Sequence, residues 1–146
     1  MKPIKHSIAY VIYHEERSQF LSVKRPSDDD DLPDVWGLPA GSLKNGETFE
    51  DAVLRSGREK LGVELKIVKL IGEGNIEREH DILHMKEYEV HVIQGEVNVP
   101  QLVDGVTQYQ AWKWATPDEL IESAQKGSLC SRLYLSSRNQ EWFSLT

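Results

Sequence analysis

The stretch from Trp36 to Val63 reads WGLPAGSLKNGETFEDAVLRSGREKLGV, and it decides the fold. Residues 48–61 show a helical pattern, because apolar side chains recur at helical spacing. These apolar residues are Phe49, Ala52, Val53 and Leu61. Thr48 with Asp51 is typical of a helix start, and Gly62 suits a left-handed C-terminal cap. The sequence therefore predicts one helix over residues 48–61.

Outward from this helix, the pattern changes to that of strands. Residues 8–13 and 20–25 are β-prone and are separated by a polar segment, so they predict a hairpin. Further strand patterns cover residues 65–71, roughly 84–93, and 109–115.

Two more helices are predicted near the C-terminal end. Thr116, Pro117 and Glu119 combine an N-cap residue, a first-turn proline and a capping-box glutamate. A last helix is expected over residues 128–137. Strands before, between and after these helices indicate the α/β class, with a mixed sheet between helices.

Composition limits the kind of protein. The 146 residues, 39% of them hydrophobic, suffice for one core, so we expect a single domain over residues 1–146. No apolar run reaches membrane-spanning length, and the first residues lack a signal-peptide pattern, which predicts a cytoplasmic protein without a membrane partner. Cys130 is the only cysteine, which excludes an intramolecular disulfide and fits a reducing compartment.

The charge balance argues against a nucleic-acid duplex as partner. Lysine and arginine number 17 against 24 aspartate and glutamate residues, a net charge of −7, which opposes attraction to a phosphate backbone. An acidic protein binds a small polyanion when a divalent cation bridges carboxylate and phosphate. The charge therefore favours a metal-bound small molecule over a polymer.

The deciding stretch resembles the Nudix family. That family's box is a glycine, five residues, a glutamate, seven residues, then Arg-Glu-hydrophobic-any-Glu-Glu-any-Gly-hydrophobic. The residues in register with it are Gly41, Glu47, Arg55, Glu59, Gly62 and Val63. Residues 36–39 and 114–120 also look like the family's flanking signatures. The resemblance implies an α/β/α sandwich with a mixed sheet, and hydrolysis of a nucleoside diphosphate linked to another group by metal-assisted attack of water on phosphorus.

The resemblance also implies roles for individual residues. Glu59 would serve in catalysis and as a ligand of Mg²⁺ or Mn²⁺, together with the carbonyl of Ala40. Glu47 and Arg55 would brace the loop against the helix, and Gly41 and Gly62 would be structural. Physically, a helix start offers free amides to phosphate, and Mg²⁺ prefers oxygen ligands.

Three residues depart from the box. Ser56 replaces a glutamate, Gly57 a hydrophobic residue and Lys60 the last glutamate. A lysine ammonium about 4 Å from a metal ion would oppose its binding by about 1 to 4 kcal/mol. Gly57 either permits a close approach by another element or reflects relaxed selection. The departures support an alternative function, a catalytically lapsed domain that senses a nucleotide or an ADP-ribose-like ligand.

Other site candidates lie outside the box. Lys24 and Arg25 end a strand near where relatives meet phosphate, although a charged strand end is an equal explanation. Asp104 is a candidate catalytic base, because the family sometimes recruits a carboxylate from such loops and Gln108 is an amide. The family's substrate markers are absent around residues 78–81, so the substrate stays open. Many relatives pair, so a homodimer also stays open.

Overall fold

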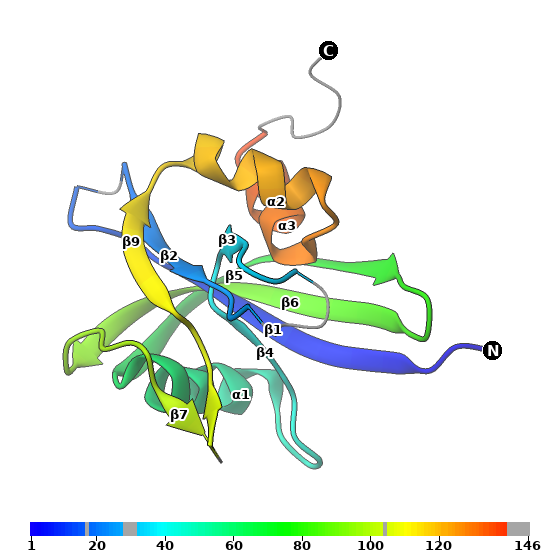
Figure 1. Ribbon diagram of the computed structural model, residues 1–146, viewed down its shortest axis with the longest axis horizontal. Helices are drawn as coiled ribbons and strands as arrows, with labels where there is room; N and C mark the ends of the chain where they lie inside the picture. Colours follow the sequence, from blue (N-terminus) through cyan, green and yellow to red (C-terminus); the bar gives the residue numbers. More distant parts are fainter. Residues whose placement is uncertain (17, 28–31, 104, 140–146) are drawn as a thin grey trace.

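A four-stranded sheet forms the centre of the computed structural model (Figure 1). Its strand order is β4 (Ala40–Ser42), β1 (Ile4–Ile12), β6 (Ile82–Gln94) and β5 (Glu64–Glu77). β1 and β6 run parallel, whereas β4 pairs with β1 and β5 pairs with β6 in antiparallel directions. The predicted mixed sheet is therefore confirmed. The structure describes residues 1–16, 18–27, 32–103 and 105–139.

A second, antiparallel sheet limits how far the predicted hairpin extends. Its strands, in order, are β3 (Trp36–Gly37), β2 (Phe20–Lys24) and β9 (Ala111–Ala115). β1 and β2 thus belong to different sheets, and the chain after β1 pairs with the chain at the start of β2 through the antiparallel bridge between Tyr13 and Phe20 and the bond from the His14 amide to the Gln19 carbonyl. Only the turn end of the predicted hairpin forms among the described residues, because β6 pairs along one edge of β1, and β4 with the Pro39 carbonyl occupies the other. The remaining described strands are β7 (Leu102–Val103) and β8 (Val106–Thr107).

Helices cover both faces of the central sheet (Figure 1). On one face lie α1 (Phe49–Ser56) and the π-helical turn η1 (Gly57–Leu61) that continues it. On the other lie the 3₁₀ turn η2 (Pro117–Leu120), α2 (Ile121–Gln125) and α3 (Leu129–Ser137). The predicted α/β/α sandwich is confirmed. No helix in the described ranges is both long and apolar enough to span a membrane.

Two apolar cores flank the sheet, and β1 contributes to both. Ile8 and Tyr10 belong to the core under α1, whereas Ala9 and Val11 belong to the core under α2 and α3. All four residues have no exposed surface. A strand buried on both faces reads as a continuous apolar run, which explains why β1 lacks polar alternation.

The helix predicted over residues 48–61 forms, with a change of geometry inside it. The Asp51 amide donates to the Thr48 hydroxyl over 3.0 Å, and Gly62 ends the helix at φ +73°. From Gly57 the backbone is π-helical. A Cβ atom at Gly57 would lie 2.5 Å from Leu65 Cδ1, closer than atoms pack. Of the two explanations for this glycine, the structure supports close approach by β5.

Replacing Gly57 with alanine is expected to lower the free energy of unfolding by about 1 to 2 kcal/mol, because overpacking outweighs the gain in helix propensity. Urea denaturation measures the change. The same substitution in a Leu65→Ala background serves as control, since the clashing side chain is gone there. An equal cost in both backgrounds would contradict the steric explanation.

Candidate functional site

The loop between β4 and α1 is held by a charged brace. Arg55 donates two hydrogen bonds to the Glu47 carboxylate, over 2.8 and 2.9 Å, and another to the Ser42 carbonyl over 2.9 Å. Glu47 also accepts from the Lys44 amide. The bonds from Arg55 hold the pKa of Glu47 below its usual range. The structure thus brings together the two residues for which the sequence predicted a bracing role.

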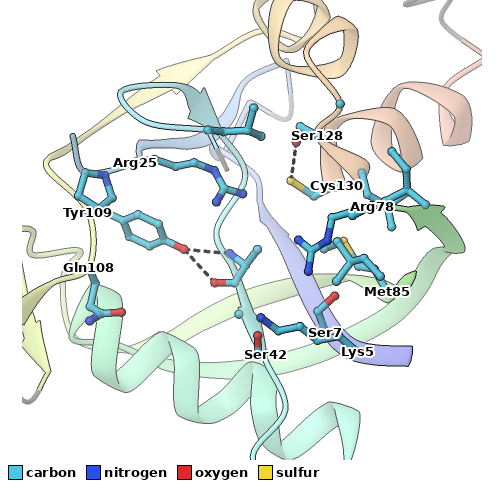
Figure 2. Close-up of a pocket in the computed structure, with 18 of the residues that line it drawn as sticks. Lys5, Ser7, Arg25, Ser42, Arg78, Met85, Gln108, Tyr109, Ser128 and Cys130 are labelled. Atoms are coloured by element: carbon cyan, nitrogen blue, oxygen red, sulfur yellow. Dashed lines mark hydrogen bonds between the residues drawn. The ribbon is translucent and has the colours of Figure 1, made fainter. Parts of the chain in front are cut away.

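A lysine and a tyrosine meet at the Ala40 peptide. The Lys60 ammonium donates to the Ala40 carbonyl oxygen. The Tyr109 hydroxyl donates to the same oxygen over 3.1 Å and accepts from the Ala40 amide over 2.9 Å (Figure 2). Lys60 Nζ also lies 5.5 Å from the centre of the Tyr109 ring. The carbonyl predicted to bind a metal ion therefore already has two hydrogen-bond donors.

The two box glycines lie against this arrangement. A Cβ atom on Gly41 would come within 3.2 Å of Lys60 Nζ, so a side chain there would crowd the ammonium. Gly62 has a left-handed backbone, which glycine adopts without strain, and its amide bonds the Gly57 carbonyl. Gly41 thus leaves room for the Lys60 ammonium, and Gly62 allows the helical segment to end.

Glu59 faces the loop after β4, not the pocket. Its Oε1 accepts from Arg55 over 3.1 Å, and its Oε2 lies 3.7 Å from Lys44 Nζ. Its side chain is 29% exposed, and it is not among the residues that line the pocket described below. Ser56 is buried, with its hydroxyl 2.9 Å from that of Tyr10, and burial raises the pKa of that tyrosine.

These donors do not fit a divalent cation. Both oxygens of Glu59 face cations, the Ala40 carbonyl binds the Lys60 ammonium, and Ser56 is turned into the core. Within the described ranges, three or more His, Cys, Asp or Glu side chains do not gather as a metal site would require. Asp104, the candidate base, lies outside the described residues. The metal and catalytic roles of Glu59 and Asp104 therefore stay predictions.

A cavity of about 630 Å³ opens beside the Ala40 peptide. The charged side chains on its wall are Lys5, Arg25, Lys60, Arg78, Lys126 and the single carboxylate Glu77. Glu77 is paired with Lys2 over 2.8 Å. Figure 2 shows Arg25 and Arg78 entering the pocket from different sides. Arg78 and Lys126 also pair with acids outside the wall, Asp81 and Glu122, but the wall itself presents more basic than acidic side chains to an anionic ligand.

The structure separates the two predicted phosphate-binding residues. Arg25 lines the pocket, but Lys24 does not. Sequence reasoning missed Tyr109, Arg78 and Lys5. Tyr109 carried one usable signal, because the hydroxyl of a tyrosine at the start of a predicted strand needs a partner when it is buried. Arg78 and Lys5 gave none, since they meet the pocket only through strand pairing.

Glu87 is a buried acid outside the pocket. It is fully buried on β6, and neither carboxylate oxygen has a hydrogen-bond partner among the described residues. Burial, and then the neighbouring Cys130, raises the pKa of Glu87 well above its usual range. The folded protein therefore favours the neutral acid at this position.

Replacing Glu87 with methionine is expected to raise the free energy of unfolding at pH 7 by about 1 to 3 kcal/mol, the cost of an unsatisfied buried polar group. The unfolded chain loses this proton at the usual glutamate pKa, while the folded chain keeps it to higher pH. Wild-type stability is therefore lost as the pH rises between these two pKa values.

Urea denaturation of wild type and the Glu87→Met variant at several pH values measures this effect. The stability difference should grow as the pH rises from acidic to neutral. Glu87→Gln is the matched control, because it removes the titration and keeps a polar group. A difference that does not change with pH would contradict the assignment.

The fold and pocket define an α/β/α domain that offers an anionic ligand a cationic wall beside its first helix. The family model described as NUDIX domain matches residues 4–133. The chain therefore belongs to the NUDIX domain family.

Individual relatives agree with this assignment. A Bacillus subtilis protein assigned as an 8-oxo-dGTP diphosphatase is 30% identical over 112 residues, which are 77% of this chain and 67% of the relative. The CTP pyrophosphohydrolase of Escherichia coli is 23% identical over 108 residues, 74% of each chain. Both relatives are named for the hydrolysis of a nucleotide.

Solved structures share the fold. The MutT protein of Methanosarcina mazei superposes with a TM-score of 0.72 at 16% identity, covering 94% of this chain and 95% of that one. The ORF135 protein of Escherichia coli gives 0.67 at 20% identity, covering 94% and 92%. At such low identity, the likeness supports the fold alone.

Proposed function

We propose that this protein binds a nucleoside diphosphate linked to another group in the pocket and hydrolyses its phosphoric anhydride. The observation that carries the proposal is the cationic wall, which has five basic side chains and one carboxylate, although Glu77, Arg78 and Lys126 are each paired with a residue outside the wall. The relatives named as a diphosphatase and a pyrophosphohydrolase support the same reaction class.

The pocket offers both kinds of contact that a nucleotide needs. The Arg25 guanidinium suits phosphate, because its planar donors match phosphate oxygens two at a time. Apolar side chains of Leu83, Met85 and Leu129 line the same cavity and would pack against a flat base. A small, phosphorylated molecule therefore fits the site better than a duplex.

The reaction in this proposal is attack of water on phosphorus, with Glu59 and Asp104 as the assigned carboxylates. A Mg²⁺ or Mn²⁺ ion would supply Lewis-acid chemistry, and Mg²⁺ commonly keeps substrate phosphates and water among its ligands. The described protein donors do not present a ready site for it. The proposal therefore depends on the anion-binding wall. Its setting is the cytoplasm, where the buried free thiol of Cys130 stays reduced.

The residues at two positions of the box support a second function, ligand binding without cleavage. Ser56 is buried against Tyr10, and Lys60 stands where the family has a carboxylate. These two replacements favour a domain that binds a nucleotide or an ADP-ribose-like ligand without cleaving it. Such a domain would report the ligand to a partner or to a second copy of itself.

A panel of nucleoside diphosphate derivatives, each tested with Mg²⁺ and with Mn²⁺, separates the two functions. Chromatography measures cleavage, and thermal unfolding of the same samples measures binding, because a bound ligand raises the melting temperature. Cleavage supports the hydrolase. Stabilisation without cleavage after long incubation identifies the binding domain, and neither effect with any compound would overturn both.

A further inference from the structure

Lys60 has no counter-ion among the acids in the described part of the chain. Its ammonium bonds the Ala40 carbonyl, and no described carboxylate lies within ion-pair distance of it. Arg55, one helical turn earlier, is by contrast fully engaged with Glu47 and Glu59. A half-buried cation without a counter-ion attracts an anion from solution.

The Ala40 carbonyl does not need this lysine. The Tyr109 hydroxyl already donates to the same oxygen over 3.1 Å, so the carbonyl is satisfied without Lys60. Gly41 leaves the approach open, since a side chain there would come within 3.2 Å of the ammonium. An ammonium has three donors, and those not used by Ala40 are available on the pocket wall that Lys60 lines.

We propose that Lys60 is a tethered cation that takes over the phosphate-holding role of a divalent metal ion, so that this pocket binds diphosphates without added metal. The inference rests on the proposed function, because it concerns the same pocket and ligand class. The ammonium bonds the backbone oxygen that the resemblance assigned to the metal. It is a point charge on a flexible stem, which suits phosphate in several geometries.

Calorimetric titration with ADP, in EDTA and in Mg²⁺, tests the proposal. Wild type should bind ADP in EDTA, and Mg²⁺ should not strengthen the binding. Lys60→Met, which keeps the stem and removes the charge, should weaken ADP binding in EDTA about tenfold, equal to about 1.4 kcal/mol. Lys66→Glu is the control, because Lys66 is exposed on β5 and does not line the pocket.

Lys60→Glu provides an independent readout with the metal alone. It should lose ADP binding in EDTA and gain measurable affinity for Mn²⁺, which wild type should lack. Circular dichroism checks that each variant folds. If Lys60→Glu does not fold, the comparison of wild type with Lys60→Met in EDTA still tests the proposal.

The contradicting outcomes differ for the two proposals. Wild-type binding of ADP only with Mg²⁺, or equal binding by wild type and Lys60→Met in EDTA, overturns the role of Lys60 and leaves the proposed function intact. No binding of ADP or of any panel compound in either buffer overturns both.

Discussion

Replacing Arg55 with alanine is expected to lower the free energy of unfolding by about 3 kcal/mol, the lower end of the range for breaking a buried ion pair. The Arg55 and Glu47 side chains are only 18% and 14% exposed, so Glu47 would keep a largely buried charge without its partner. The bond to the Ser42 carbonyl would be lost as well. Urea or thermal unfolding at pH 7 measures the change.

Arg58→Ala is the matched control for this prediction. Arg58 is an exposed arginine of the same helical segment and pairs with the exposed Glu64 over 3.3 Å, so its loss should cost less than about 1 kcal/mol. The deficit of Arg55→Ala should also shrink in acid. The folded pKa of Glu47 is depressed, so its contribution is complete above the usual glutamate pKa and is lost as the pH falls through the folded value. Equal losses at both arginines would contradict the brace.

The second large effect concerns ligand binding. Arg25→Ala is expected to weaken ADP binding by about ten- to a hundredfold, since a hydrogen bond to a charged group contributes about 1.5 to 3 kcal/mol. Arg25 lines the pocket from the end of β2, and in Figure 2 its guanidinium points into the cavity. Calorimetry with ADP measures the loss.

Lys24→Ala supplies the comparison, because Lys24 precedes Arg25 on the chain and does not line the pocket. Its loss should change ADP affinity less than about threefold, a difference below 1 kcal/mol. The sequence could not distinguish the two residues, so the pair also tests the placement of the site. Equal losses at both positions would mean that general charge, not this pocket, attracts the ligand.

The sequence predicted features that depend on neighbours along the chain. The helix from Thr48 to Gly62 follows from a capping side chain and a glycine at the other end, and both are visible locally. Strand pairing is not local. β1 has the composition of a hairpin strand, yet its edges are taken by β6, which is far away in sequence, and by β4.

The same limit applies to the site. Glu47 and Arg55 are only eight residues apart, and their alignment with the Nudix box was enough to predict that they contact each other. The contact of Lys60 with the Ala40 carbonyl requires the folded turn, and the Tyr109 contact spans 69 residues. The sequence marked Lys60 only as a missing carboxylate, and the fold shows which group it meets.

The π-helical turn at Gly57–Leu61 also affects how this domain could be re-engineered. A turn closed by bonds five residues apart advances through a smaller angle per residue than an α-helix does. Positions 56 and 60 nevertheless both reach Gly41, where a Cβ atom would lie 3.9 Å from the Ser56 hydroxyl and 3.2 Å from Lys60 Nζ. Their polar ends bond different partners, the Tyr10 hydroxyl and the Ala40 carbonyl. Glutamates at both positions would therefore bring two carboxylates toward Gly41, and the one at position 56 would replace the buried hydroxyl that now bonds Tyr10.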